Sequence, residues 1–169
     1  MTAALAIDAG QPCVELDLGA LQLQLQLRIH HGRGRSTEQH GLPIGLETLA
    51  HAFGDRMPDA LALENGIAEV EDAIMSAAQW LPAQVQTLCT ADPLLRQLVL
   101  SATGAPVHPG PQRAAREAIE HLFAVLAGQA EQGLHTGQAQ PQDVQAAAAL
   151  LILRECLHHW GMLQVQLLD

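Results

Sequence analysis

The residues from Leu21 to Ile29 alternate between apolar and polar side chains, and this pattern constrains the fold more than any other part of the sequence. Leucine or isoleucine fills every odd position, while three glutamines and one arginine fill the even positions. Successive side chains of a β-strand point to opposite faces, so a period of two predicts a strand with one buried face. A second run, from Cys13 to Leu18, alternates in the same way.

Gly19-Ala20 separates the two runs and predicts a two-residue type II′ hairpin, because glycine suits the first position of that turn. In this register Leu18 opposes Leu21, and every apolar side chain of both strands falls on one face. The residues from 162 to 168 alternate leucine or valine with glutamine. We therefore expect this last strand to join the hairpin in one sheet.

The middle of the chain predicts helices. Apolar residues recur at three- and four-residue spacing from Pro58 to about Trp80, and Asp92-Pro93 forms a good helix start. Further helices are expected over 42–53, 94–102, 112–127 and 141–160, the last apolar almost all round and therefore central, with a short strand over 84–90.

The fold class that follows is α+β: a small sheet rich in Leu and Gln, made of the N-terminal hairpin and the C-terminal strand, covered by about five helices. We expect residues 1–169 to form a single domain, with a loose N-terminus over 1–11 and an internal linker over 128–140.

Composition excludes several kinds of chemistry. The chain has no lysine and no tyrosine, so Walker A phosphate binding, Schiff-base or pyridoxal chemistry and Ser-Lys catalysis are ruled out. No nucleotide-binding or pyridoxal motif is present, while a metal cofactor stays open. The net charge of −10 opposes binding to nucleic acid or an anionic membrane.

The N-terminus and the cysteines point to a cytoplasmic protein. The first residues carry no positive charge before a short apolar run that ends at Asp8, unlike a signal peptide. The longest uncharged apolar stretch is too short to span a membrane. The three cysteines never form a C-x-x-C pair, which argues against a disulfide framework or a thiolate zinc site.

One candidate site is the segment from Arg28 to His40, which includes most of the loop expected over residues 32–41. In this acidic chain it is a local concentration of arginine, glycine and hydroxyl groups, which suit a phosphate or carboxylate ligand or an acidic partner. The alternative is a solvated connection. The candidate anion- or partner-binding residues are Arg28, Arg33, Arg35, Ser36 and His40.

A second candidate is a metal site on helices. Glu155 and His158 have the Glu-x-x-His spacing used in di-iron bundles, and Glu117 with His121 is one residue longer but still on one helical face. The alternative is a helix end where the histidines cap the last carbonyls. Two weaker candidates are a reactive Cys89 and an acidic stripe made of Glu64, Glu69, Glu71 and Asp72, which is otherwise a solvated helix face.

These observations favour a non-enzymatic binding or accessory protein that acts through protein–protein contacts, with itself as a homodimer or with another protein. Catalytic signatures are missing, and the Gln-rich strands offer uncharged edges for pairing. Two alternatives remain: a metal-binding protein or metal-dependent enzyme that uses the Glu/His pairs, and a small-anion-binding module built on the Gly-Arg loop.

Overall fold

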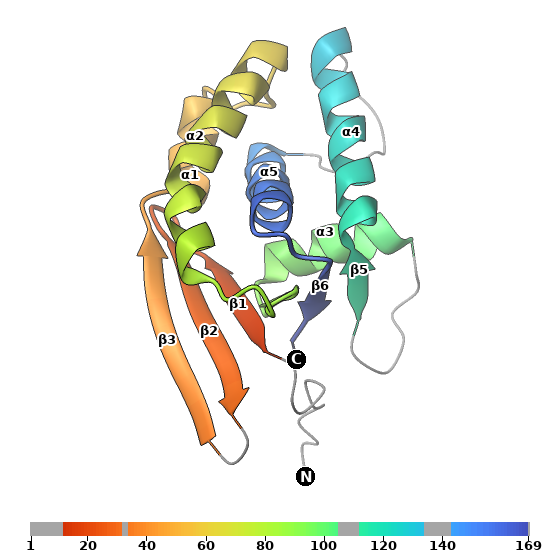
Figure 1. The fold of residues 1–169 in the computed structure, drawn as a ribbon. Helices are drawn as coiled ribbons and strands as arrows, with labels where there is room; N and C mark the ends of the chain where they lie inside the picture. Colours follow the sequence, from red (N-terminus) through yellow and green to blue (C-terminus); the bar gives the residue numbers. More distant parts are fainter. Residues whose placement is uncertain (1–11, 32–33, 105–111, 134–142, 169) are drawn as a thin grey trace.

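A computed structural model describes residues 12–31, 34–104, 112–133 and 143–168 and shows, within them, one six-stranded mixed sheet and five helices (Figure 1). The expected α+β fold is confirmed. The strands are β1 Cys13–Leu18, β2 Leu23–His31, β3 Gly34–Leu42, β4 Thr87–Thr90, β5 Arg113–Ala115 and β6 Gln164–Leu167. The helices are α1 Leu46–Ala52, α2 Ala60–Trp80, α3 Pro93–Thr103, α4 Arg116–Gln132 and α5 Val144–His159.

The sheet has the strand order β3-β2-β1-β4-β6-β5. Strands β1, β4 and β6 run parallel. Strand β2 pairs antiparallel with β1, β3 pairs antiparallel with β2, and β5 pairs antiparallel with β6. The N-terminal hairpin and the C-terminal strand therefore belong to one sheet, as expected. The short strand β4 lies between them.

The expected two-residue hairpin is wrong, and its register is shifted by two residues. Leu18 pairs with Leu23, and Leu16 pairs with Leu25, so the connection is the four-residue turn 19–22. A side chain at Gly19 would place its Cβ 2.1 Å from the Gln22 carbonyl oxygen, so this turn requires glycine. A shift of two residues preserves which side chains face the core, and the buried Leu face is therefore retained.

The loop expected over 32–41 is also wrong, because residues from Gly34 onward form strand β3, which pairs with β2 along its whole length. This strand lies at the edge of the sheet, and its residues 37–41 are exposed. Residues 37–41 include no buried apolar side chain, so this segment lacks the alternation that identifies strands in a sequence. Pairing with β2 makes it a strand.

Helix α5 is the centre of the helical layer, as its apolar composition predicts. It lies between α2 and α4 in Figure 1 and also packs against α1 and α3. Its residues from Ala146 to Leu153 are all buried. Aspartates cap three helices: Asp59 accepts from the Ala62 amide, Asp92 from the Leu94 and Leu95 amides, and Asp143 from the Ala146 amide.

Several expected boundaries change. The helix expected over 42–53 begins at Leu46, and the helix expected over 112–127 begins at Arg116 and continues to Gln132, through the start of the expected linker. The unexpected strand β5 precedes it and pairs with β6. Residues 1–11 and most of the expected linker lie outside the described residues. No helix in the described part of the chain is long and apolar enough to cross a membrane.

Candidate functional site

The parallel strands β1 and β4 end at the same edge of the sheet, here called the carboxyl edge. Asp17 and Leu18 end β1, and Thr90 ends β4 beside them. Sheets that contain parallel strands bind ligands outside the carboxyl ends of those strands, because the loops that follow can converge there. This edge is therefore the first place to look for a site.

The turn 19–22 is held at the carboxyl edge by the start of α1. The Leu46 amide donates to the Gly19 carbonyl at 3.0 Å, and the Glu47 amide donates to the Ala20 carbonyl at 2.8 Å. A Cβ at Gly45 would lie 2.4 Å from the Ala20 carbonyl oxygen, so glycine permits this close approach. The turn is thus fixed in place, and these α1 amides are already used.

The loop after β4 is equally well ordered. The Thr90 hydroxyl donates to the Leu16 carbonyl at 2.9 Å and accepts from the Asp92 amide at 3.0 Å, which ties β4 to β1. The Asp92 carboxylate accepts from the Leu94 and Leu95 amides at 2.8 and 3.1 Å. The first amides of α3 therefore bind a carboxylate of the chain itself.

A shallow pocket of about 290 Å³ lies on the sheet next to this edge. Two carboxylates on one face of β1 line it together with amide side chains from β2 and β3: Glu15, Asp17, Gln24, Gln26 and Gln39. The strand register brings them together, because Glu15 pairs with Gln26, which pairs with Gln39, while Asp17 pairs with Gln24. Asp17 is exposed, and Glu15 is half-buried.

A second pocket, of about 410 Å³, lies on the helical side of the turn 19–22. Its lining includes Leu21 from the turn, Glu47 and His51 from α1, Asp55, and Gln145 from α5. His51 Nδ1 lies 3.2 Å from Asp55 Oδ2, and both side chains are largely exposed. The two pockets flank the same turn.

This arrangement can do proton-transfer chemistry. An exposed carboxylate such as Asp17 can accept a proton or bind a hard cation, and the glutamine amides donate and accept hydrogen bonds. Sequence reasoning missed Asp17 and Glu15 because they read as the polar positions of an alternating strand. The sequence signal that could have found Asp17 is its position near the end of the first expected strand, two residues before Gly19.

Three of the predicted anion-binding residues, Arg28, Arg35 and Ser36, lie away from this edge. Arg28 pairs with Thr37, Ile29 with Ser36 and His30 with Arg35 in the β2–β3 hairpin, and Arg28 is level with Cys13 at the start of β1. Arg33 lies outside the described residues.

His40 is separated from these arginines and contacts α2 instead. Its ring lies 4.2 Å from the Trp80 ring, and the Trp80 indole N–H donates to Glu38 at 2.9 Å. Anion binding at this hairpin stays a prediction.

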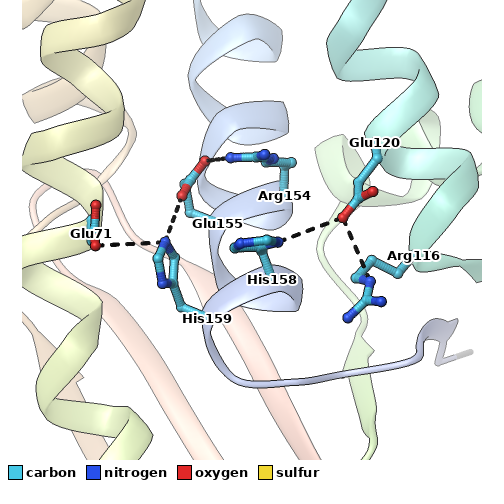
Figure 2. A network of polar contacts seen from close by, with 7 residues as sticks. All are labelled: Glu71, Arg116, Glu120, Arg154, Glu155, His158 and His159. Atoms are coloured by element: carbon cyan, nitrogen blue, oxygen red, sulfur yellow. Dashed lines mark hydrogen bonds and ion pairs between the residues drawn. The ribbon is translucent and has the colours of Figure 1, made fainter.

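Two of the predicted metal ligands, Glu155 and His158, form ion pairs with other partners (Figure 2). Glu155 is fully buried and contacts Arg154 and, at 3.1 Å, His159 rather than His158. His158 instead faces Glu120 of α4 at 3.7 Å. Glu117 is an exposed neighbour of Arg116, and His121 is exposed. In the part of the chain that the structure describes, no three His, Cys, Asp or Glu side chains are arranged to hold a metal ion.

The weaker candidates are placed as follows. Glu64, Glu69 and Asp72 are exposed on α2, and Glu71 faces His159 at 4.0 Å. Cys89 is fully buried in β4.

Burial raises the pKa of the Cys156 thiol well above its ordinary value, and the neighbouring Glu155 carboxylate raises it further.

No known family model matches the chain, and no curated protein sequence matches it. Solved structures do match in fold. The Aquifex aeolicus PPX-GPPA enzyme has a TM-score of 0.72 at 15% identity, over 96% of this chain and 55% of that protein. An exopolyphosphatase-like protein matches at 0.70 and 12%, over 100% and 58%. An exopolyphosphatase from Cytophaga hutchinsonii matches at 0.65 and 9%, over 99% and 55%.

The chain therefore spans about half the length of these structures, and at such identities the similarity shows the fold. It contradicts the expectation of a non-enzymatic accessory protein defined by protein binding, because structures that share the fold over nearly the whole chain are described as an enzyme, a phosphatase and an exopolyphosphatase. The homodimer expected from the sequence stays a prediction.

Proposed function

We propose that this chain is a phosphatase domain that hydrolyses the terminal phosphoanhydride bond of polyphosphate. The observation that carries the proposal is its fold similarity, over 96% of its length, to the Ppx/GppA phosphatase of Aquifex aeolicus. The exopolyphosphatases with the same fold suggest the substrate class. The carboxyl edge, with its exposed carboxylate and neighbouring amides, is the site we assign to this reaction.

Hydrolysis needs a base for the attacking water. The water oxygen forms a bond to the terminal phosphorus, the bridging P–O bond breaks, and the bridging oxygen leaves with its electron pair. Asp17, exposed at the end of β1, accepts the proton of the water. The amides of Gln24 and Gln39 in the same pocket donate to phosphate oxygens. The first amides of α3 do not take this role, because Asp92 occupies them.

The arginines of the β2–β3 hairpin are suited to bind the part of a long polyphosphate chain that extends beyond Asp17. Arg28 pairs level with Cys13, four positions before Asp17, which is about 13 Å along the strand at about 3.3 Å per residue. A chain of several phosphates bound at Asp17 can reach the hairpin. Arginine binds phosphate oxygens in a bidentate manner, so Arg28 and Arg35 would favour long chains over short ones.

The test is phosphate release from long-chain polyphosphate in the presence of Mg²⁺, with protein in excess over substrate so that slow turnover is detected. Asp17→Asn should lower the rate at least about a hundredfold, because it removes the base and preserves the size of the side chain. Asp72→Asn is the matched control, since Asp72 is an exposed carboxylate on α2, outside the pocket. Its rate should stay within about twofold of the unchanged protein.

Two results would overturn the proposal. One is phosphate release by the unchanged protein no faster than in the protein-free control. The other is equal rates for Asp17→Asn and Asp72→Asn.

The role of the hairpin is tested by Arg28→Ala combined with Arg35→Ala, which should slow hydrolysis of long chains and leave the hydrolysis of tripolyphosphate unaffected. Equal effects on both substrates would contradict that role.

A further inference from the structure

Strand β3 forms one end of the sheet, and no strand among the described residues pairs with its outer side (Figure 1). It has nine residues, and its pairing with β2 continues from residue 34 to residue 42 without a bulge. Residues 37–41 are all exposed. The backbone N–H and C=O groups on the outer side of such a strand are a template for pairing with another strand.

This edge lacks the features that usually protect an edge strand. Natural edge strands are kept short, bulged or covered, or they contain proline or lysine. The strand at the other end of the sheet, β5, has three residues and leads directly into α4. Strand β3 is longer and contains neither proline nor lysine. Helix α2 packs against one face of β3, where Trp80 contacts His40 and Glu38, and leaves the outer side open to a further strand.

We propose that this further strand is β3 of a second copy of the chain, paired antiparallel about a twofold axis at Gln39. The exposed stretch 37–41 is centred on Gln39, so this register matches the stretch with itself. A twofold axis normal to the sheet keeps the helices of both copies on the same side and joins the two sheets into one. Thr37 then lies opposite the partner's Gly41.

The side chains of this stretch complement one another in that register. Glu38 lies opposite the partner's His40, and His40 lies opposite the partner's Glu38. An imidazole N–H can donate to a carboxylate, and Glu38 has further acceptor positions besides the Oε2 atom that accepts from Trp80. An axis at Glu38 would instead place two glutamates directly opposite each other, which is destabilising. The charges therefore favour the axis at Gln39.

The second copy also extends the candidate site. Gln39 lines the pocket that contains Asp17, on the face of β3 opposite to Trp80. The partner's Gln39 lies directly across the axis, where the two amides can donate to each other. The pockets of the two copies thus become one continuous row of amides. The strand pairing itself does not depend on the proposed phosphatase activity.

Cross-linking through an introduced cysteine tests the position of the axis. The three cysteines of the chain are buried, so an exposed one should react first. Gln39→Cys places two thiols directly opposite, with Cβ atoms about 5 Å apart, and a short thiol cross-linker should convert most of the protein into a covalent dimer. Thr37→Cys is the matched control on the same face of the strand. The two Thr37 positions lie about 13 Å apart along the strands, so this variant should stay mostly uncross-linked.

Sedimentation equilibrium over a dilution series measures the dissociation constant of the dimer. His40→Glu creates two pairs of opposed glutamates and should raise this constant about five- to tenfold. His121→Glu makes the same change at an exposed position on α4 and should leave it within about twofold. The double variant Glu38→His with His40→Glu exchanges the two partners and should restore dimerisation.

Three results would overturn the proposal. The first is an unchanged protein that is monomeric throughout the dilution series. The second is a dimer in which Gln39→Cys cross-links no better than Thr37→Cys. The third is an equal effect of His40→Glu and His121→Glu on the dissociation constant. In the last two cases the dimer forms through a surface other than β3.

Discussion

The end of helix α5 and the carboxyl edge of the sheet both contain carboxylates, but the burial and the neighbours of these carboxylates differ between the two regions. Glu155 on α5 is fully buried between Arg154 and His159. Asp17 on the carboxyl edge is exposed in a shallow pocket, beside neutral amides. A buried carboxylate must be paired to be tolerated, whereas an exposed one is free to meet a ligand. The first arrangement serves stability, and the second is available for chemistry.

The largest effect on stability should come from Glu155→Ala. This variant leaves Arg154 and His159 without their shared carboxylate and opens a space beside α5, and we expect a loss of about 2 kcal/mol in the free energy of unfolding. Glu117→Ala, on the exposed face of α4, should cost less than about 0.5 kcal/mol. Urea unfolding of both variants is the measurement, and equal losses would remove the contrast between the two kinds of carboxylate.

The Cys156 thiol, next to Glu155, makes the free energy of unfolding depend on pH in the alkaline range. Its pKa is raised in the folded state by burial and by Glu155, so the folded protein keeps a proton that the unfolded chain releases. Stability is therefore intact below the unfolded thiol's pKa and falls as the pH rises above it, by up to about 1.4 kcal/mol per pH unit.

The absence of lysine and tyrosine makes this effect unusually easy to observe, because few other groups titrate between the histidines and the arginines. Cys156→Ala should lower the slope of stability against pH between about pH 8.5 and 10. Thermal unfolding of both proteins across that range is the test, and an unchanged slope would show that the folded thiol ionises normally.

A smaller loss is expected at the capped start of α3. Asp92→Ala removes the acceptor for the Leu94 and Leu95 amides and should cost about 1 kcal/mol. Asp72→Ala, within α2, has no such cap to lose and should be close to neutral. If the two variants unfold at the same urea concentration, the cap does not order this loop.

The smallest effect on stability should come from Asp17→Asn, within about 0.5 kcal/mol, because the side chain is exposed and the amide keeps its shape. This is the variant expected to have the largest effect on phosphate release. A large loss of stability would instead place Asp17 with Glu155, as a carboxylate that holds the fold together.

The candidate site shows how far sequence patterns reach. The alternation in β1 and β2 identifies both strands and their buried faces, yet it gives Asp17 and Glu15 no more weight than the glutamines. They gain significance when the register places them beside Gln24, Gln26 and Gln39. The pairing of Glu155 with His159 rather than His158 was likewise undetermined, because residues at three- and four-residue spacing lie on the same helical face.

The sequence by itself determined the elements whose side chains are sorted by burial: the alternating strands β1, β2 and β6, the apolar helix α5, and the helix start at Asp92-Pro93. These follow from local periodicity and capping, which a linear sequence records directly. Only the tertiary structure decided that the polar segment after Gly34 is a strand, that residues 113–115 pair with β6, and which carboxylates are buried. Each of these depends on contact between residues far apart in the chain, and local periodicity does not encode such contacts.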